Sequence, residues 1–69
     1  MYNFQDKPCA QAPLKSYRYI ARIGVVMIGA MSDEEALDEA ARSIAPAKPE
    51  IGYLQVWDAN LKHYTACKA

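Results

Sequence analysis

A single helix signal lies between two stretches of strand-type sequence, and this arrangement limits the folds open to the chain. Ser32 and Glu35 have the spacing of a capping box. The residues after Ser32 are acidic, and the N-terminal end of a helix favours negative charge. Pro46 ends the pattern, because proline cannot continue a helix. We therefore expect one helix between Ser32 and Pro46.

The expected helix has a narrow apolar stripe in which half of the residues are alanine. The stripe consists of Leu37, Ala40, Ala41 and Ile44, which recur at intervals of three and four residues. Asp38 and Arg42 are spaced to pair on the outer side of the helix. Because its buried side chains are small, the helix is expected to lie close against a sheet.

Residues 16 to 30, before the helix, are rich in β-branched and aromatic side chains and contain no proline, which is typical of strands. The stretch is longer than the usual strand of about six residues, so we expect it to bend at Ile23-Gly24. A hairpin of residues 16 to 22 with residues 25 to 30 is favoured. One long strand with a bulge at Gly24 is the alternative.

Two further strands are expected after the helix, at residues 51 to 57 and 61 to 67, with a turn at residues 58 to 60. The element order is then β(β)αββ. This order predicts an α+β fold in which one helix packs on one face of a three- or four-stranded, mostly antiparallel sheet.

The chain is expected to form one small domain, residues 15 to 69, preceded by an extended arm, residues 1 to 14. The arm contains two prolines and no periodic pattern. Tyr2 and Phe4 are the residues expected to pin it to the domain.

One helix covers only one face of such a sheet, so we expect the other face to meet water or a partner. Leu54 and Val56 carry no polar atom and are assigned to the helix side, and the alternation of side chains along a strand sends their neighbours to the open side. Aromatic and arginine side chains dominate binding hot spots. The predicted partner-binding residues on the open face are Arg18, Arg22, Tyr53, Gln55 and Trp57.

The start of the helix forms a secondary, acidic surface. Its residues are Asp33, Glu34, Glu35, Asp38 and Glu39. We interpret this surface as a capped and solvated helix face, with contact to a basic partner as the alternative.

The charge balance and hydropathy bear on the partners. Eight basic and eight acidic side chains give a formal net charge of zero, which disfavours duplex DNA as a partner and lowers the barrier to self-association. A homodimer through the open sheet face is therefore a further expectation. The longest apolar stretch, residues 23 to 31, is far shorter than a membrane span, and no signal peptide is visible. We expect a cytoplasmic protein without a membrane partner.

No catalytic, cofactor-binding or metal-binding motif is recognisable, so we expect a protein that is not an enzyme and needs no cofactor. His63 is the one histidine, and the chain has no Gly-rich phosphate loop. Cys9 and Cys67 are interpreted as two ordinary thiols. The alternative, a disulfide between them, would need an oxidising compartment.

Three segments carry a resemblance to a known class of proteins. They are the strands of residues 17 to 30, the helix of residues 33 to 43, and Leu-Gln-Val-Trp-Asp at residues 54 to 58. Together they resemble small proteins from the early regions of bacteriophages and prophages. Proteins of this size in such regions commonly bind and block host machinery, as anti-CRISPR proteins do. The resemblance thus implies a phage-encoded inhibitor of a host protein or nucleoprotein complex.

Two other functions remain open. Arginines beside tyrosine and tryptophan on an open sheet are typical of single-stranded nucleic-acid binding. The Ser-Asp-Glu-Glu-Ala-Leu segment at residues 32 to 37 is similar to the helix start of small antitoxins with a partial RNase H-like fold. That similarity implies an antitoxin or regulatory subunit.

Overall fold

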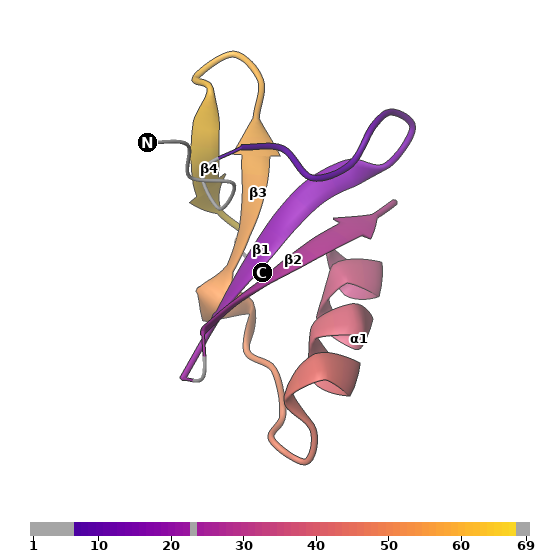
Figure 1. Ribbon diagram of the computed structural model, residues 1–69, viewed down its shortest axis with the longest axis vertical. Helices are drawn as coiled ribbons and strands as arrows, with labels where there is room; N and C mark the ends of the chain where they lie inside the picture. Colours follow the sequence, from indigo (N-terminus) through magenta and orange to yellow (C-terminus); the bar gives the residue numbers. More distant parts are fainter. Residues whose placement is uncertain (1–6, 23, 68–69) are drawn as a thin grey trace.

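A four-stranded antiparallel sheet carries one helix on one face (Figure 1). The computed structural model describes residues 7–22 and 24–67. The elements are β1 (Lys15–Ala21), β2 (Gly24–Ala30), α1 (Asp33–Ile44), the 3-10 turn η2 (Ile51–Tyr53), β3 (Leu54–Asp58) and β4 (His63–Ala66). The strands lie in the order β2-β1-β3-β4. The expected α+β fold is therefore confirmed, with four strands.

β1 and β2 form a hairpin, so the chain adopts the favoured hairpin and not the single bulged strand. Their register runs from the pair Lys15 and Ala30 to the pair Ala21 and Gly24. Gly24 has a φ of 142°, a backbone conformation that side chains disfavour. A glycine at this position therefore lets the chain reverse within a short turn.

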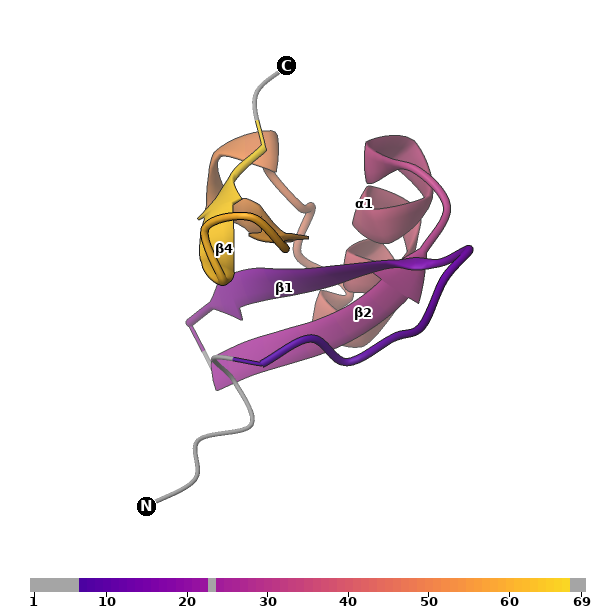
Figure 2. The same cartoon turned by 90° about the horizontal axis from the view of Figure 1, so that it is seen from above.

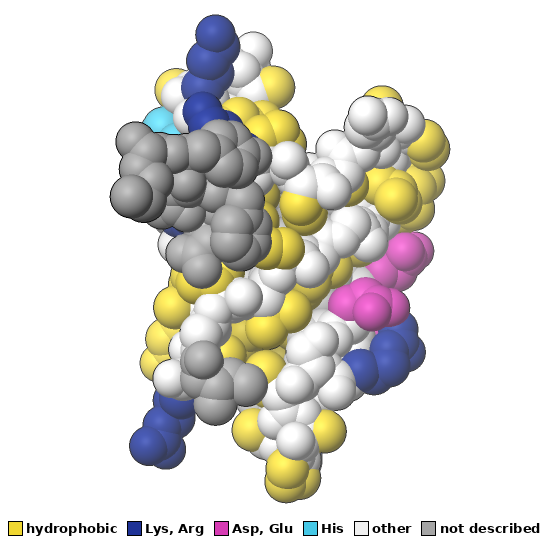
Figure 3. Space-filling model, in the orientation of Figure 1, with side chains coloured by type: hydrophobic (Ala, Val, Ile, Leu, Met, Phe, Trp, Pro, Cys, Tyr) yellow, Lys and Arg dark blue, Asp and Glu magenta, His cyan; other side chains and the backbone are white. Residues whose placement is uncertain are grey.

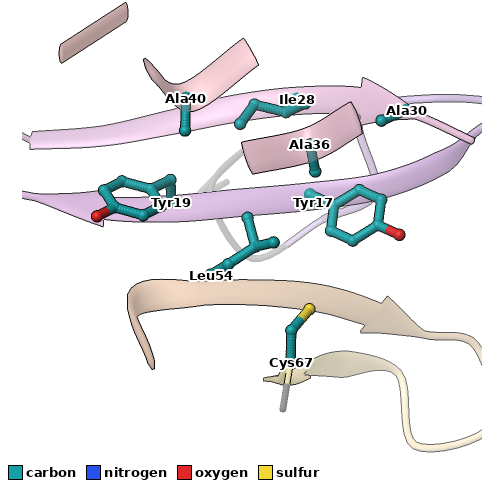
Figure 4. Packing of buried hydrophobic residues seen from close by; sticks show 8 residues of the cluster. All are labelled: Tyr17, Tyr19, Ile28, Ala30, Ala36, Ala40, Leu54 and Cys67. Atoms are coloured by element: carbon teal, nitrogen blue, oxygen red, sulfur yellow. The ribbon is translucent and has the colours of Figure 1, made fainter. Parts of the chain in front are cut away.

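The core lies between α1 and the sheet, beside β2 and β1 (Figure 4). Tyr17 and Leu54 are fully buried, and Ala36 and Ala40 of α1 are also completely covered. Small side chains at these helical positions allow α1 to approach the strands closely. Ala40 belongs to the predicted apolar stripe, whereas Ala36 was not part of it, and the other stripe residues Leu37, Ala41 and Ile44 are only half-buried. The remaining members of the buried cluster are Tyr19, Ile28, Ala30 and Cys67.

The start of α1 is capped as expected. The Glu35 backbone N–H donates to Ser32 Oγ over 3.2 Å, and Glu35 Oε1 accepts from the Met31 backbone N–H over 3.4 Å. The expected pair of Asp38 with Arg42 is wrong, because the Arg42 guanidinium donates to Glu39 one turn back on the helix. Glu39 lies at the other near position, three residues before Arg42, and both side chains point into solvent.

The strand expected at residues 51 to 57 begins only at Leu54. The three residues before it form η2, in which the Tyr53 N–H donates to Glu50 O over 3.1 Å. The Glu50 N–H in turn donates to the Tyr19 hydroxyl over 2.8 Å. This anchor on β1 holds the segment in a turn, so Tyr53 does not alternate with the strand residues that follow it.

The last strand, expected at residues 61 to 67, runs only from His63 to Ala66. Asp58 Oδ1 accepts from the backbone N–H groups of Asn60 and Leu61, and Lys62 has a positive φ of 58°. These features extend the turn to Lys62. Side-chain acceptors of this kind favour turns over strands.

The face of the sheet opposite α1 is partly covered, which corrects the expectation of an open face. The segment of residues 7 to 14 runs along β1 and β2 on the side away from the helix (Figure 2). Ser16 and Gly29 face each other across the hairpin at this place, and a side chain on Gly29 would meet Ala10 at 3.0 Å. Small residues on the sheet therefore let the arm lie flat. Tyr2 and Phe4, the expected anchors, lie outside the described residues.

Candidate partner-binding surface

The sheet face opposite α1 brings together three of the five predicted site residues. Arg18 pairs with Gln55 across β1 and β3, and Trp57 pairs with Tyr64 across β3 and β4. In antiparallel strands paired residues point to the same side, so the four side chains share one face. We call Arg18, Gln55, Trp57 and Tyr64 the face cluster.

The side chains of the face cluster hold one another in place. Arg18 Nε donates to Gln55 Oε1 over 2.5 Å, and the guanidinium carbon lies 4.6 Å from the centre of the Tyr64 ring. Trp57 meets the same ring edge-on, with the ring centres 5.3 Å apart at an interplanar angle of 72°. Cation–π and edge-to-face contacts each stabilise such a group by about 1 kcal/mol. The cluster is thus ordered before any partner arrives.

Tyr64 is the centre of the face cluster, although sequence reasoning did not select it as a site residue. Its side chain is buried, with 7 % of the residue exposed, and its hydroxyl donates to Lys7 O over 2.8 Å. Burial, followed by the neighbouring Cys9 thiol, raises the pKa of Tyr64 to about 12. The length of the turn between β3 and β4 is the sequence signal that was missed. Because the turn pairs Asp58 with His63, the next pair of the two strands is Trp57 with Tyr64.

The arm is fastened to the same face by specific hydrogen bonds. Ser16 Oγ accepts from the backbone N–H groups of Cys9 and Ala10, over 3.0 and 2.8 Å. The Ser16 hydroxyl also donates to Ala10 O over 3.2 Å. The Cys9 thiol donates to Ile28 O over 3.3 Å. Residues 7 to 10 therefore form part of the surface that a partner would meet.

The other two predicted site residues, Arg22 and Tyr53, are not on this face cluster. Arg22 follows the end of β1 and is exposed. Tyr53 lies in η2, is 53 % exposed, and packs edge-on against Tyr19 with the ring centres 6.3 Å apart. The assignment of Tyr53 to the face of Gln55 and Trp57 is therefore wrong. Tyr53 belongs to η2, so it does not follow the alternation of side chains that begins with β3 at Leu54.

Arg22 and Tyr53 instead line a hollow at the end of the sheet, which we call the end groove. It has a volume of about 780 Å³ and is widely open to solvent. Its walls are the end of β1, the end of α1 and the linker between α1 and η2. The lining residues are Tyr19, Ile20, Ala21, Arg22, Ile44, Ala47, Lys48, Glu50 and Tyr53.

Basic and acidic side chains are unevenly distributed on the surface. Figure 3, viewed from the side of the arm, has Lys and Arg side chains beside the β1–β2 turn and beside the β3–β4 turn, and acidic side chains along the edge formed by α1, where a further basic side chain lies next to them. The acidic residues do not all face outward as one free surface. Asp33 accepts a hydrogen bond from the Tyr17 hydroxyl over 2.7 Å, and Glu39 binds Arg42.

Glu34 and Asp38 are exposed members of the predicted acidic surface. Glu35 is also exposed, but it takes part in the cap of α1. The acidic surface is therefore built largely from groups that already stabilise the helix or tie it to β1. Burial of the Tyr17 hydroxyl and its bond to Asp33 raise the pKa of that tyrosine well above its ordinary range.

The two cysteines lie on opposite faces of the sheet and are both free. Cys67 belongs to the core beneath α1, where burial, followed by the charge of Asp33, raises its pKa to about 11. Cys9 lies with the arm on the other face. The sheet separates the two thiols, so the interpretation as ordinary thiols agrees with the fold and the disulfide alternative does not.

Within residues 7–22 and 24–67, no group of three or more His, Cys, Asp or Glu side chains is arranged to hold a metal ion. Over the same residues, no helix has the length and apolar character needed to cross a membrane. Comparison with protein-family models, curated proteins and solved structures finds no match for the chain.

Proposed function

We propose that the chain is a non-catalytic interaction protein that binds another protein through the face cluster. The observation that carries the proposal is the cluster on the sheet face opposite α1, in which Arg18 lies over the Tyr64 ring and Trp57 makes a T-shaped contact with the same ring. Trp, Tyr and Arg are the residue types that contribute most to protein interfaces. Arg18 and Trp57 are half-buried, so each keeps part of its surface available for contact.

The order within the cluster favours binding. Immobilising a long side chain at an interface costs about 1 kcal/mol, and Arg is among the most flexible. Here the hydrogen bond to Gln55 and the contact with the Tyr64 ring already restrict Arg18. A partner that meets this surface therefore loses less free energy to ordering than one that meets a free arginine.

A protein partner fits the cluster better than a single-stranded nucleic acid. Stacking of bases requires an aromatic ring with an open face. One face of Tyr64 lies under Arg18, Trp57 makes a T-shaped contact with the ring, and the residue as a whole is buried. The net charge of zero also provides little attraction for a phosphate backbone.

We extend the proposal to a phage-encoded inhibitor that acts in the cytoplasm on a host protein or nucleoprotein complex. This extension is supported by the resemblance of the strand and helix segments to small proteins of phage early regions. The homodimer expected through the sheet face is a competing use of the same surface, since one copy cannot offer the face cluster to both partners.

The test compares the wild-type chain with Trp57→Ala and with Leu61→Ala, an exposed residue of the β3–β4 turn that serves as a matched control. Each tagged protein is incubated with bacterial lysate, and captured proteins are quantified by mass spectrometry. We expect one partner or complex to be enriched by the wild type and by Leu61→Ala, and lost with Trp57→Ala. Circular dichroism confirms that each variant is folded.

Equal capture by a folded Trp57→Ala variant contradicts the proposal. In parallel, fluorescence anisotropy measures binding of labelled single-stranded DNA and RNA at about 50 mM salt, where electrostatic affinity is high. Binding that Trp57→Ala abolishes would replace the protein partner with a nucleic acid. Sedimentation of the wild type alone tests the homodimer.

A further inference from the structure

The end groove lies where β1 extends beyond the residues that pair with β3. The register between these strands covers Tyr17 to Tyr19 of β1, and Tyr19 pairs with Leu54, the first residue of β3. Ile20 and Ala21 continue the strand on the side of β2. On the β3 side of Ile20 and Ala21, no described strand pairs with β1, and the turn η2 lies there instead.

The wall and floor of the groove are largely apolar. Ile20 is 38 % exposed although it lies in a strand, and Tyr53, another lining residue, is also exposed. Ile44 at the end of α1 and Ala47 in the linker complete the apolar lining. Large apolar side chains that gather around one hollow mark a binding surface more often than single ones scattered over the molecule.

Two cations are among the residues that line this groove. Arg22 follows β1, and Lys48 belongs to the linker after α1, while Glu50 is the one acidic residue of the lining. Neither cation forms an ion pair with another described residue, in contrast to Arg42, which binds Glu39. The charges at the groove therefore favour an occupant that carries a carboxylate.

We propose that the end groove binds an extended peptide segment of another protein, with apolar side chains on the floor and a carboxylate between Arg22 and Lys48. An extended segment suits an open groove, since it can place alternate side chains in the groove while the rest of the segment stays in solvent. Small-molecule sites enclose most of the ligand surface. The end groove is too open to do so, whereas a peptide needs contact along one side only.

This inference goes beyond the proposed function, because the groove and the face cluster share no residue. A partner that meets both surfaces would contact the sheet face opposite α1 and the end of β1. The two proposals can fail separately, since a variant of one surface leaves the other intact.

The experiment selects peptides from a random twelve-residue library displayed on filamentous phage, with the wild-type chain immobilised. The test variant carries Arg22→Glu and Lys48→Glu. The control variant carries Lys15→Glu and Lys62→Glu, which change the net charge equally at exposed positions outside the groove. Amide spectra of both variants verify that the fold is retained.

We expect the wild type to enrich peptides that combine acidic residues with apolar ones. A synthetic peptide of the enriched sequence is expected to lose affinity about tenfold or more in the test variant, which corresponds to roughly 1.4 kcal/mol. Its affinity is expected to be unchanged in the control variant and in Trp57→Ala. Amide shifts on titration are expected at Ile20 and Tyr53.

Three outcomes overturn the inference: no enrichment above background, enriched peptides that bind the test variant as tightly as the wild type, or amide shifts confined to other residues. Loss of affinity in Trp57→Ala alone would assign the peptide to the face cluster. That result would support the proposed function and remove the groove as the peptide site.

Discussion

The face cluster and the end groove contain similar residue types but differ in how their polar groups are satisfied. In the cluster, Arg18 contacts Gln55 and Tyr64, and the Tyr64 hydroxyl binds the arm. In the groove, Arg22 and Lys48 make no ion pair with another described residue. The face cluster is part of the packed structure, whereas the groove cations lie on its surface without such contacts to other described residues.

This difference teaches that composition alone does not identify a surface available for binding. Arginine and aromatic side chains on a sheet can stabilise the fold, bind a partner, or do both. Substitution separates these roles. A residue that belongs to the packed structure changes stability and binding together, whereas a residue of a loose surface changes binding alone.

The largest expected contrast is between two tyrosines. Tyr64→Ala removes a buried ring, its contacts with Arg18 and Trp57, and the hydrogen bond to Lys7, so we expect a loss of about 3 kcal/mol of unfolding free energy. Tyr53→Ala removes an exposed ring and is expected to cost less than about 1 kcal/mol. Urea unfolding followed by circular dichroism measures both.

Equal losses for the two tyrosines would break the comparison, because they would make Tyr53 as structural as Tyr64. Tyr64→Phe refines the result. It keeps the ring and removes only the hydroxyl that donates to Lys7 O, so it should cost about 1 kcal/mol.

Alkaline pH is expected to destabilise the chain through groups that the fold keeps protonated. The pKa of Cys67 is raised from 9.0 to about 11, and that of Tyr64 from 10.0 to about 12, in both cases mainly by burial. Because the unfolded chain ionises first, the stabilisation is complete below pH 9 and is lost as the pH rises through 11 and 12. Each group accounts for on the order of 2 kcal/mol.

Unfolding free energies measured between pH 7 and 12 test this expectation. Tyr64→Phe should flatten the upper part of the profile and Cys67→Ala the lower part. Tyr17, whose pKa is raised even further, adds to the alkaline loss in both variants. A profile that neither variant changes would contradict the contribution of Cys67 and Tyr64.

The arm is expected to contribute less. Ser16→Ala removes the acceptor for the Cys9 and Ala10 N–H groups, which should cost about 1 kcal/mol and speed the hydrogen exchange of both amides. Ser43→Ala is the matched control, since among the described residues Ser43 Oγ bonds only to Glu39 O, on an exposed helix turn. Unchanged exchange at Cys9 and Ala10 would mean that other contacts hold the arm.

The smallest expected effect concerns the groove cations. Arg22→Glu together with Lys48→Glu should change the unfolding free energy by less than about 0.5 kcal/mol, because no ion pair between described residues is lost. Thermal unfolding measures the change. A loss above about 1 kcal/mol would show that these side chains belong to the packed structure after all.

Local sequence patterns predicted much of the fold. The cap at Ser32, the stop at Pro46 and the strand-type residues before the helix each depend on neighbours in the chain, so the helix and the hairpin were predictable. The sides of β1 were also assigned correctly, with Arg18 away from the helix and Tyr17 in the core.

The errors arose where long-range contacts decide the structure. The Tyr19 hydroxyl holds the backbone of Glu50 and converts the start of an expected strand into η2. The arm covers the sheet because Ser16 and Gly29 happen to be neighbours across a hairpin. Tyr64 belongs to the face cluster because the length of the β3–β4 turn pairs it with Trp57. None of these contacts leaves a periodic signal in the sequence.

The strand order also has a consequence for how the chain folds. The pairs β1–β2 and β3–β4 are hairpins, whose strands are close in sequence and can form within microseconds. Among the described strands, only the β1–β3 pairing joins residues on either side of α1, through three residue pairs. We expect the search for this central pairing to limit the folding rate, since closing the intervening loop costs entropy before the contacts form.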